Sequence, residues 1–190
     1  VCNLFITNRK MKTYIFLASG FEETEYIATI DLLRRAKIDV ESISISEEKE
    51  VIGAHNIVIL ADKVFSEVDF SDAEMLILPG GMPGTNNLNN FKPLLEILKK
   101  HYSANKPIAA ICAAPLIFGQ LGFLENQKAC CYPGFEQELK GANVLDCSAV
   151  TSGEVITGQS AGGVFDFALQ IISKLRGKEL AQQISEQIIY

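Results

Sequence analysis

The sequence predicts one α/β domain in which a mostly parallel sheet is covered by helices on both faces. Short apolar runs alternate with helical patterns from one end of the chain to the other. Several of these runs are apolar at every position, which is typical of parallel strands buried on both faces. The length of 190 residues fits a single domain, and no repeat, low-complexity tract or linker divides the chain.

The strands are predicted where apolar runs end at turn residues. Thr13–Ala18 is followed by Ser19-Gly20, and Met75–Leu78 is followed by Pro79-Gly80-Gly81. The other predicted strands are Val40–Ile45, Val51–Ala54, Ile57–Leu60, Pro107–Ile111 and Val155–Thr157. Gly53 marks a turn or bulge, so the strands on either side of it are expected to form a short hairpin.

The helices are predicted from the spacing of apolar residues and from the charges at helix ends. Glu22–Lys37 is acidic in its first turn and basic in its last, the distribution that the helix dipole favours. The other predicted helices are Leu94–His101, Ala114–Leu121, Val164–Leu175 and Glu179–Ile189. A glycine-rich loop, Gly158–Gly163, follows the last strand.

Composition and charge narrow the class of protein. Apolar residues make up 48% of the chain and charged residues 21%, as in ordinary folded domains. The net charge of −6 and the pI near 5.0 argue against nucleic acid or an anionic membrane as the main partner. No apolar run reaches the roughly 18–20 residues of a membrane span. We therefore expect neither nucleic acid nor membrane as a partner.

The five cysteines show no spacing typical of a metal site. Without a secretory signal pattern, they indicate free thiols in a reducing cytoplasm. Arg9 and Lys10 follow the apolar start of the chain, the reverse of a signal peptide's order, and Met11-Lys12 resembles a natural start. Residues 1–11 are therefore assigned to a leader or an expression remnant, and residues 12–190 to the domain.

Ligands of open α/β sheets bind beyond the carboxyl ends of the strands, and Cys112 occupies such a position. It joins a predicted strand to a predicted helix among small residues, as a nucleophile does at a sharp strand-to-helix turn. The N–H of Ala113 would then face a developing oxyanion, and the helix N-terminus would lower the thiol pKa. An inert buried cysteine is the alternative interpretation.

Glu25 strengthens the interpretation of Cys112 as a functional residue. On its predicted helix it shares a face with Leu32 and Ala36, so it points inward. A buried carboxyl is unfavourable unless it is protonated or paired. A protonated Glu25 would donate a hydrogen bond to a Cys112 thiolate. The alternative, an acid that only complements the helix dipole, fits Glu22 and Glu23 better.

Ser160 is a competing nucleophile because Gly158–Gly162 matches the G-x-S-x-G pattern between a strand and a helix. In α/β-hydrolases the catalytic histidine follows the serine, whereas His55 and His101 both precede Ser160. The loop is better explained by close backbone approach and helix capping. His101 is expected to complement a helix C-terminus and His55 to lie at the surface. No cofactor is indicated, and no carboxylate cluster is spaced for a metal.

Four segments carry a resemblance to a known family: Ser-Gly-Phe-Glu-Glu-Thr-Glu (19–25), Leu-Pro-Gly-Gly (78–81), Ala-Ala-Ile-Cys-Ala-Ala-Pro (109–115) and Thr-Gly-Gln-Ser-Ala-Gly-Gly (157–163). In order and spacing they resemble the ThiJ/PfpI superfamily, within it the branch of the parkinsonism-associated protein (DJ-one) and its bacterial relatives. The resemblance covers about residues 12–190. It implies a flavodoxin-like fold, a homodimer and no cofactor.

The resemblance also implies roles for individual residues. Cys112 matches the family's reactive, readily oxidised cysteine, and Glu25 matches the protonated glutamate beside it. Gly81 and Ala113 match the backbone donors of an oxyanion-hole-like pocket, and Gly80 is expected to line the same pocket. Tyr132 stands where many members carry a histidine before proline. A phenol is a poor general base at neutral pH, so Tyr132 is expected to be a pocket wall or a hydrogen-bond donor.

The leading functional hypothesis is a cysteine-dependent enzyme that acts on reactive carbonyls or glycated adducts with glyoxalase- or deglycase-like chemistry. Cys112 would add to an aldehyde such as methylglyoxal, Gly81 and Ala113 would stabilise the oxyanion, and Glu25 would move the proton. The rival hypothesis is a non-enzymatic redox sensor or chaperone-like stress protein in which Cys112 is oxidised. An amidase or peptidase is disfavoured by the missing histidine.

Overall fold

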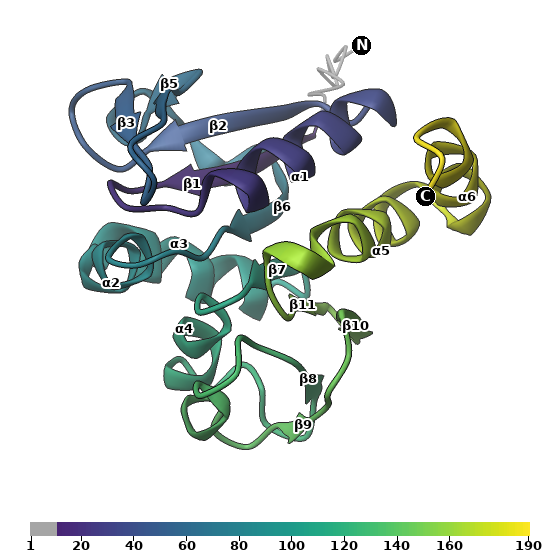
Figure 1. Cartoon of the computed structure of the whole chain (residues 1–190). Coiled ribbons are helices and arrows are strands. Elements are labelled where there is room, and N and C mark those ends of the chain that lie inside the picture. Colours follow the sequence, from purple (N-terminus) through teal and green to yellow (C-terminus); the bar gives the residue numbers. More distant parts are fainter. Residues whose placement is uncertain (1–10) are drawn as a thin grey trace, which may run out of the picture.

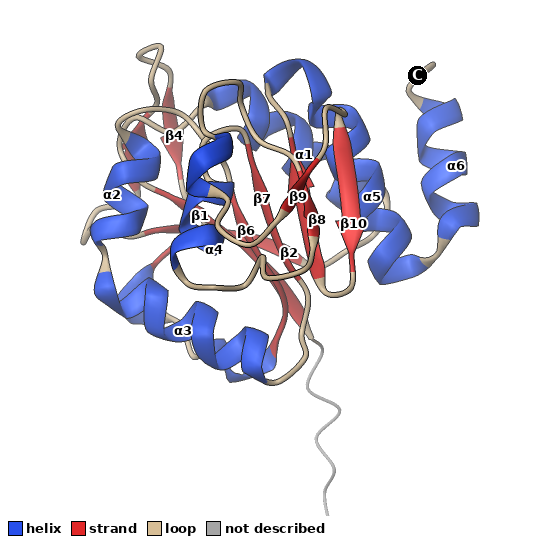
Figure 2. Cartoon of the chain, turned by 90° about the horizontal axis from the view of Figure 1, so that it is seen from below, coloured by secondary structure: helices blue, strands red, loops and turns tan. Residues whose placement is uncertain are grey.

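The central sheet has seven strands in the order β10-β11-β7-β6-β1-β2-β5 in the computed structural model, which describes residues 11–190 (Figures 1 and 2). Its strands are β1 (Lys12–Leu17), β2 (Val40–Ser44), β5 (Lys63–Val64), β6 (Ala73–Leu78), β7 (Ile108–Ile111), β10 (Ala149–Ser152) and β11 (Val155–Gly158). All neighbouring pairs are parallel except β10 and β11. The mostly parallel α/β fold is thus confirmed. The assigned leader lies almost wholly outside the described residues.

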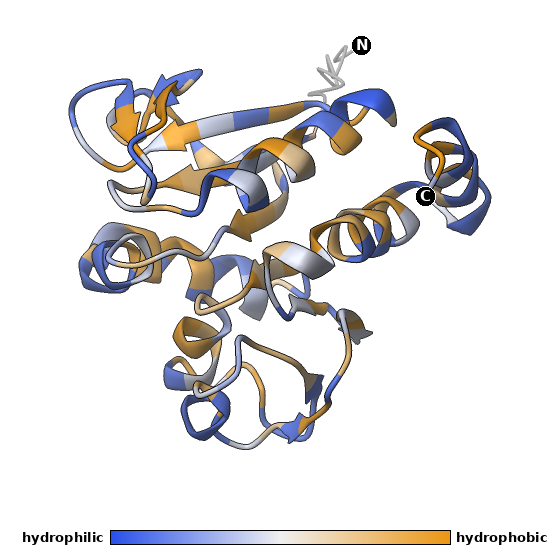
Figure 3. Cartoon of the chain, in the orientation of Figure 1, coloured by the Kyte–Doolittle hydropathy of each residue, from blue (hydrophilic) through white to orange (hydrophobic). Residues whose placement is uncertain are grey.

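Alternate residues of the strands point to opposite faces and build two apolar cores. On β1, Ile15 and Leu17 face one core, whereas Tyr14 and Phe16 face the other. The first core is covered by α1 (Glu23–Arg35), α5 (Val164–Arg176) and α6 (Lys178–Gln187), and the second by α2 (Gly84–Asn90), α3 (Lys92–Ser103) and α4 (Pro115–Gln120). Figure 3 shows the apolar residues gathered along the strands between these layers.

Two small strand pairs lie outside the main sheet. The predicted hairpin is confirmed as the antiparallel pair β3 (Glu50–Ile52) and β4 (Val58–Leu60). The parallel pair β8 (Lys128–Ala129) and β9 (Asn143–Val144) was not predicted. Single turns of 3-10 helix occur at Phe65–Glu67, Phe70–Asp72, Glu136–Glu138 and Ala161–Gly163.

The short elements escaped prediction for a common reason: they lack a periodic apolar face. The sequence of α2 is polar except for Leu88, which is fully buried. β5, β8 and β9 have only two residues each, and no residue of β10 is fully buried. Within residues 11–190, no helix combines the length and the apolar character needed to cross a membrane.

Candidate active site

Cys112 lies directly after β7, at the carboxyl edge of the sheet, with φ of +65°. Few residues other than glycine adopt this left-handed conformation, which is unfavourable and frequent at functional sites. Backbone bonds hold the residue on both sides: its N–H donates to the Gly158 carbonyl (3.0 Å), and its carbonyl accepts from the Tyr132 N–H (2.8 Å). The predicted sharp turn between strand and helix is therefore present, and it leaves the side chain half-buried.

Glu25 faces Cys112 from the first turn of α1 and is only 1% exposed. Glu22 caps the start of this helix, and its side chain accepts a hydrogen bond from the Glu25 N–H (2.7 Å). The Gly80 N–H donates to Glu25 Oε2 (2.8 Å), whereas the buried Oε1 has no hydrogen-bond partner of good geometry in the described chain. The inward orientation predicted for Glu25 is confirmed.

The two glycines after β6 allow the carboxyl and the thiol to approach each other. A Cβ atom on Gly80 would lie 2.6 Å from Cys112 Cβ and 2.8 Å from Glu25 Oε2. Gly81 has φ of +88°, and a Cβ there would lie 2.3 Å from the Glu22 nitrogen. No other amino acid fits either position without displacing the backbone.

Burial dominates the electrostatics of this pair. It raises the pKa of Glu25 to about 7, and the Gly80 N–H only partly offsets the effect. Burial and the neighbouring Glu25 carboxylate raise the pKa of Cys112 to about 12, although hydrogen bonds from the backbone of Ala113 and Gly81 lower it. The expectation of a lowered thiol pKa is therefore wrong for this arrangement, since loss of solvent around the sulfur outweighs the two backbone donors.

Burial therefore disfavours the ionised form of both groups, and a charge on Glu25 further disfavours a charge on the sulfur. The pKa of Glu25, raised to about 7, leaves its carboxyl able both to accept and to donate a proton near neutral pH. The sequence predicts a protonated Glu25, and the raised pKa of this carboxyl agrees with that prediction. The geometry thus fits Glu25 as a general base for the thiol.

A small pocket of about 150 Å³ opens beside the sulfur. Its walls are formed by Gly81, Met82, Cys112, Ala113, Tyr132 and Phe135. Tyr132 belongs to the wall, with 48% of its surface exposed, and no hydrogen bond links its hydroxyl to residues 11–190. Gly80, expected as a pocket residue, instead lies fully buried behind Cys112, because its N–H is turned toward Glu25.

The competing nucleophile and the two histidines lie apart from this arrangement. Ser160 has an extended backbone (φ −167°), so the strained turn belongs to Cys112 and not to the serine. His55 is exposed, as expected, and its Nδ1 lies 2.9 Å from Glu23 Oε2. His101 is buried instead of serving as a charged helix end: its Nε2 lies 3.1 Å from the Pro107 carbonyl oxygen, and burial lowers its pKa to about 4.

Glu22, Glu23 and His55 form a group of potential metal ligands that the sequence did not reveal. Their ligand atoms lie within 4.8 Å of one another. The Glu23 carboxylate already accepts hydrogen bonds from the His55 N–H (2.6 Å) and the Ile57 N–H (3.4 Å) in addition to its contact with the imidazole. These bonds attach the β3–β4 hairpin to α1, which explains the cluster without an ion.

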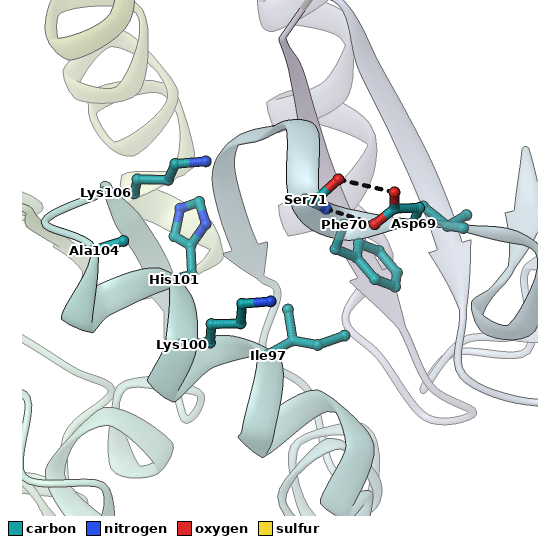
Figure 4. Close-up of a pocket in the computed structure, with 9 residues that line it drawn as sticks. Asp69, Phe70, Ser71, Ile97, Lys100, His101, Ala104 and Lys106 are labelled. Atoms are coloured by element: carbon teal, nitrogen blue, oxygen red, sulfur yellow. Dashed lines mark hydrogen bonds between the residues drawn. The ribbon is translucent and has the colours of Figure 1, made fainter.

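A larger cavity, of about 320 Å³, lies at the opposite, amino-terminal edge of the sheet (Figure 4). Its walls are Val68, Asp69, Phe70, Ser71, Ile97, Lys100, His101, Ala104 and Lys106. β7 begins at Ile108, next to this cavity, whereas Cys112 follows the other end of that strand. The larger cavity contains no cysteine, and ligands of open α/β sheets bind at the carboxyl edge. We therefore assign the candidate active site to the smaller pocket.

Comparison with known proteins agrees with this geometry. The sequence profile of the DJ-1/PfpI family matches residues 11–174. Protein DJ-1 homolog B of Arabidopsis thaliana is 36% identical over 180 residues, which are 94% of this chain and 41% of that protein. Deglycase TK1284 of Thermococcus kodakarensis is 29% identical over 169 residues, covering 87% of this chain and 100% of the relative.

Solved structures give the same result. The oxidized form of Toxoplasma gondii DJ-1 superimposes with a TM-score of 0.90 at 31% identity, covering 95% of this chain and 98% of the other. The chain nevertheless spans less than half the length of the Arabidopsis relative named above.

Proposed function

Because this chain belongs to the DJ-1/PfpI family, we propose that it acts on reactive carbonyl compounds with Cys112 as the nucleophile. The observation that carries the proposal is the strained Cys112 backbone, which presents the thiol to a buried carboxyl and to two backbone N–H groups. A purely structural cysteine requires none of these features. The Thermococcus relative named a deglycase supports carbonyl compounds or their adducts as the substrate class.

The proposed reaction begins with addition of the sulfur to an aldehyde carbon. As the S–C bond forms, the thiol proton passes to the Glu25 carboxylate, and the carbonyl electron pair moves to oxygen. The N–H groups of Gly81 and Ala113, which contact the sulfur in the resting site, stabilise this oxyanion. The product is a hemithioacetal. Glu25 can return its proton to the oxygen, so acid and base are supplied by one residue.

The shape of the pocket favours a small substrate. A volume of about 150 Å³ suits a short aldehyde such as methylglyoxal better than a long chain. Met82 and Tyr132 line the pocket and are each nearly half exposed, so the aldehyde-derived part of a larger adduct can also reach the sulfur. An amidase or peptidase is a poorer fit, because His55 contacts Glu23 and His101 is buried at the opposite edge of the sheet.

A second candidate function is redox sensing through oxidation of Cys112. It is favoured by the similarity to Toxoplasma gondii DJ-1, whose structure is described as oxidized. The two functions differ in what is consumed, because an enzyme turns over carbonyl compound whereas a sensor reacts with peroxide once per reduction. A chaperone-like role belongs to this second class and requires no turnover.

We also propose that the protein is a cytoplasmic homodimer. The four cysteines of the described residues are free thiols, which suits a reducing compartment. On the outer side of α1, Ile27 is 43% exposed and lies with Ile57 of the hairpin and Phe165 of α5 around one shallow depression. A second copy of the chain would cover these apolar side chains.

Lactate formation from methylglyoxal tests the leading proposal. Wild-type protein should produce lactate well above the buffer-catalysed background, and Cys112→Ala should abolish the excess. The variant removes only the sulfur from a half-buried position, so its thermal unfolding should remain close to that of the wild type. Equal lactate formation by the two proteins would exclude Cys112 as the nucleophile and leave the redox function as the better candidate.

A further inference from the structure

A second pair of thiols, Cys130 and Cys147, lies outside the proposed active site. Cys130 follows β8 and is fully buried, and its N–H donates to Thr157 Oγ1 (2.8 Å) on β11. Its thiol lies 3.3 Å from the Thr157 carbonyl oxygen. The Cys147 side chain lies next to that of Cys130, close enough for its thiol to help raise the pKa of Cys130. The two residues are 17 positions apart in the sequence, so only the fold brings them together.

The backbone around both cysteines is fixed by neighbouring strands. On one side, the Leu145 N–H donates to the Ala129 carbonyl (2.8 Å), which continues the pairing of β8 with β9. On the other, the Gln159 N–H donates to the Ser148 carbonyl (2.9 Å), next to the β10–β11 pairing. Figures 1 and 2 show β8, β9 and β10 gathered at this end of the molecule. Each cysteine is therefore one or two residues from a hydrogen bond that positions it.

We propose that Cys130 and Cys147 are a dithiol that hydroperoxides convert into an intramolecular disulfide. Cys147 is only half-buried, so it meets the oxidant first. Its sulfur attacks the peroxide O–O bond, which releases an alcohol or water and leaves a sulfenic acid. The Cys130 sulfur then displaces hydroxide from that sulfenic acid, and its own proton leaves with the hydroxide as water. Two thiols and one hydroperoxide thus yield one disulfide, one alcohol and one water.

Cys131 provides a natural control, since it is adjacent to Cys130 but packs elsewhere. Successive residues of an extended segment point in opposite directions. Cys131 belongs to the core beneath α3 and α4, whereas Cys130 contacts Thr157. Burial raises the pKa of both thiols, to about 12 for Cys130 and about 11 for Cys131, so neither is an intrinsically strong nucleophile. The contact with Cys147 distinguishes Cys130.

Mass spectrometry of the full chain after peroxide treatment tests this proposal. Cys130 and Cys131 share the tryptic peptide 129–140, and Cys147 lies in the peptide 141–174. After free thiols have been blocked with iodoacetamide and the protein has been digested without reductant, we expect these two peptides to be joined, with the loss of two hydrogens. Dithiothreitol added before the block should abolish the joined species.

Three variants make the outcome specific. Cys147→Ser, at a half-buried position that tolerates the change, should eliminate the joined peptides, whereas Cys131→Ala should retain them. Cys112→Ser should also retain them, so the result is independent of the proposed carbonyl chemistry. The proposal is overturned if wild-type protein shows no joined peptides at a peroxide concentration that already oxidises Cys112, or if Cys131→Ala loses them.

Discussion

At the scale of single residues, the central feature is the buried carboxyl of Glu25 beside the half-buried thiol of Cys112. Glu25 is held on the inner side of α1, and Gly80 lets Cys112 pack against it without an intervening side chain. The pocket beside them has no histidine in its wall. Proton transfer in this pocket must therefore involve Glu25, Tyr132 or water.

The pH dependence of the reaction follows from Glu25. Its pKa of about 7 means that the carboxylate, and with it the capacity to accept the thiol proton, is present above that pH and lost below it. Carbonyl turnover at a fixed substrate concentration should therefore rise with pH and level off above pH 7. In Glu25→Gln the amide cannot accept the proton, so this rise should disappear and turnover should fall by about 10²–10⁴-fold. A variant that retains the wild-type profile would exclude Glu25 as the base.

The same carboxyl should make the stability of the protein depend on pH. Because the pKa of Glu25 is raised from 4.5 to about 7, the folded state binds its proton more tightly than the unfolded state. The free energy of unfolding should consequently decrease between these two pH values, by roughly 3 kcal/mol. Denaturant unfolding of Glu25→Gln, compared with wild type at each pH, isolates this contribution. Parallel pH profiles of the two proteins would contradict it.

Gly80 offers a direct test of the packing between Glu25 and Cys112. The added methyl group of Gly80→Ala would meet atoms of both residues at 2.6 and 2.8 Å, so the pair must separate or the backbone must shift. We expect slower alkylation of Cys112 by iodoacetamide and a loss of about 1–3 kcal/mol in stability, as is usual for overpacking. Gly162→Ala is the matched control, since its methyl group would have no neighbour closer than 3.7 Å.

Substitutions of Tyr132 show whether this residue only lines the pocket or also donates a proton. Its hydroxyl has no hydrogen-bond partner in residues 11–190, and its ring lines the pocket, so we expect Tyr132→Phe to change carbonyl turnover by less than about tenfold. Tyr132→His would add a base at the rim and should raise turnover. Steady-state kinetics of both variants decide the point. A larger loss in the phenylalanine variant would mean that the hydroxyl is a working donor.

At the scale of secondary-structure elements, buried polar groups attach the loops to the sheet. Glu23 joins α1 to the β3–β4 hairpin through the backbone of His55 and Ile57. The end of α3 is attached differently, through the contact between His101 and the carbonyl group of Pro107 just before β7. Glu23 and His101 are both of a residue type that is common at protein surfaces, but both side chains are buried in the fold.

The attachment of α3 makes the free energy of unfolding depend on pH through His101. This contribution rises with pH, whereas the contribution of Glu25 falls. Burial lowers the pKa of His101 from 6.5 to about 4, so the unfolded state binds the proton more tightly. The contribution of neutral His101 to the free energy of unfolding is fully present above pH 6.5. It is lost as the pH falls toward 4, and the total decrease is roughly 3 kcal/mol. His101→Gln keeps a hydrogen-bond donor but does not titrate, so thermal unfolding across this range should be flatter for the variant. His55→Gln, at an exposed position, should not flatten it in the same way.

At the scale of the whole molecule, the sheet separates the possible ligand sites. The Cys112 pocket opens at the carboxyl edge, and the larger cavity beside His101 opens at the amino-terminal edge. The apolar side chains around Ile27, Ile57 and Phe165 form a third surface, over the outer side of α1 and α5. Substrate and partner copy would thus occupy different parts of the protein surface.

Sedimentation equilibrium tests the proposed dimer. Ile27 is 43% exposed on α1, and Ile27→Glu would place a charge in the contact between two copies, so we expect the wild-type dimer to shift toward monomer. Val144→Glu introduces the same charge at a residue that is 37% exposed on β9, away from this surface, and should leave the dimer intact. A monomeric wild-type protein would contradict the proposal.

Patterns within short stretches of the sequence are enough to predict the sheet, its main helices and the position of the proposed nucleophile. Continuous apolar runs such as Met75–Leu78 can be stable only between two layers, and Cys112 between a buried strand and a helix has to make a sharp turn. The inward orientation of Glu25 followed from helical spacing alone. These are local properties, fixed by residues that are neighbours along the chain.

Properties that depend on residues far apart in the sequence become visible in the folded structure. The pKa values of Cys112 and Glu25 are both raised because burial is a sum over the whole surroundings of a group. The burial of His101, the cluster of Glu22, Glu23 and His55, and the contact between Cys130 and Cys147 join segments that no local pattern connects. Short or polar elements such as α2 are stabilised by what they pack against, so their own residues carry too little signal to predict them.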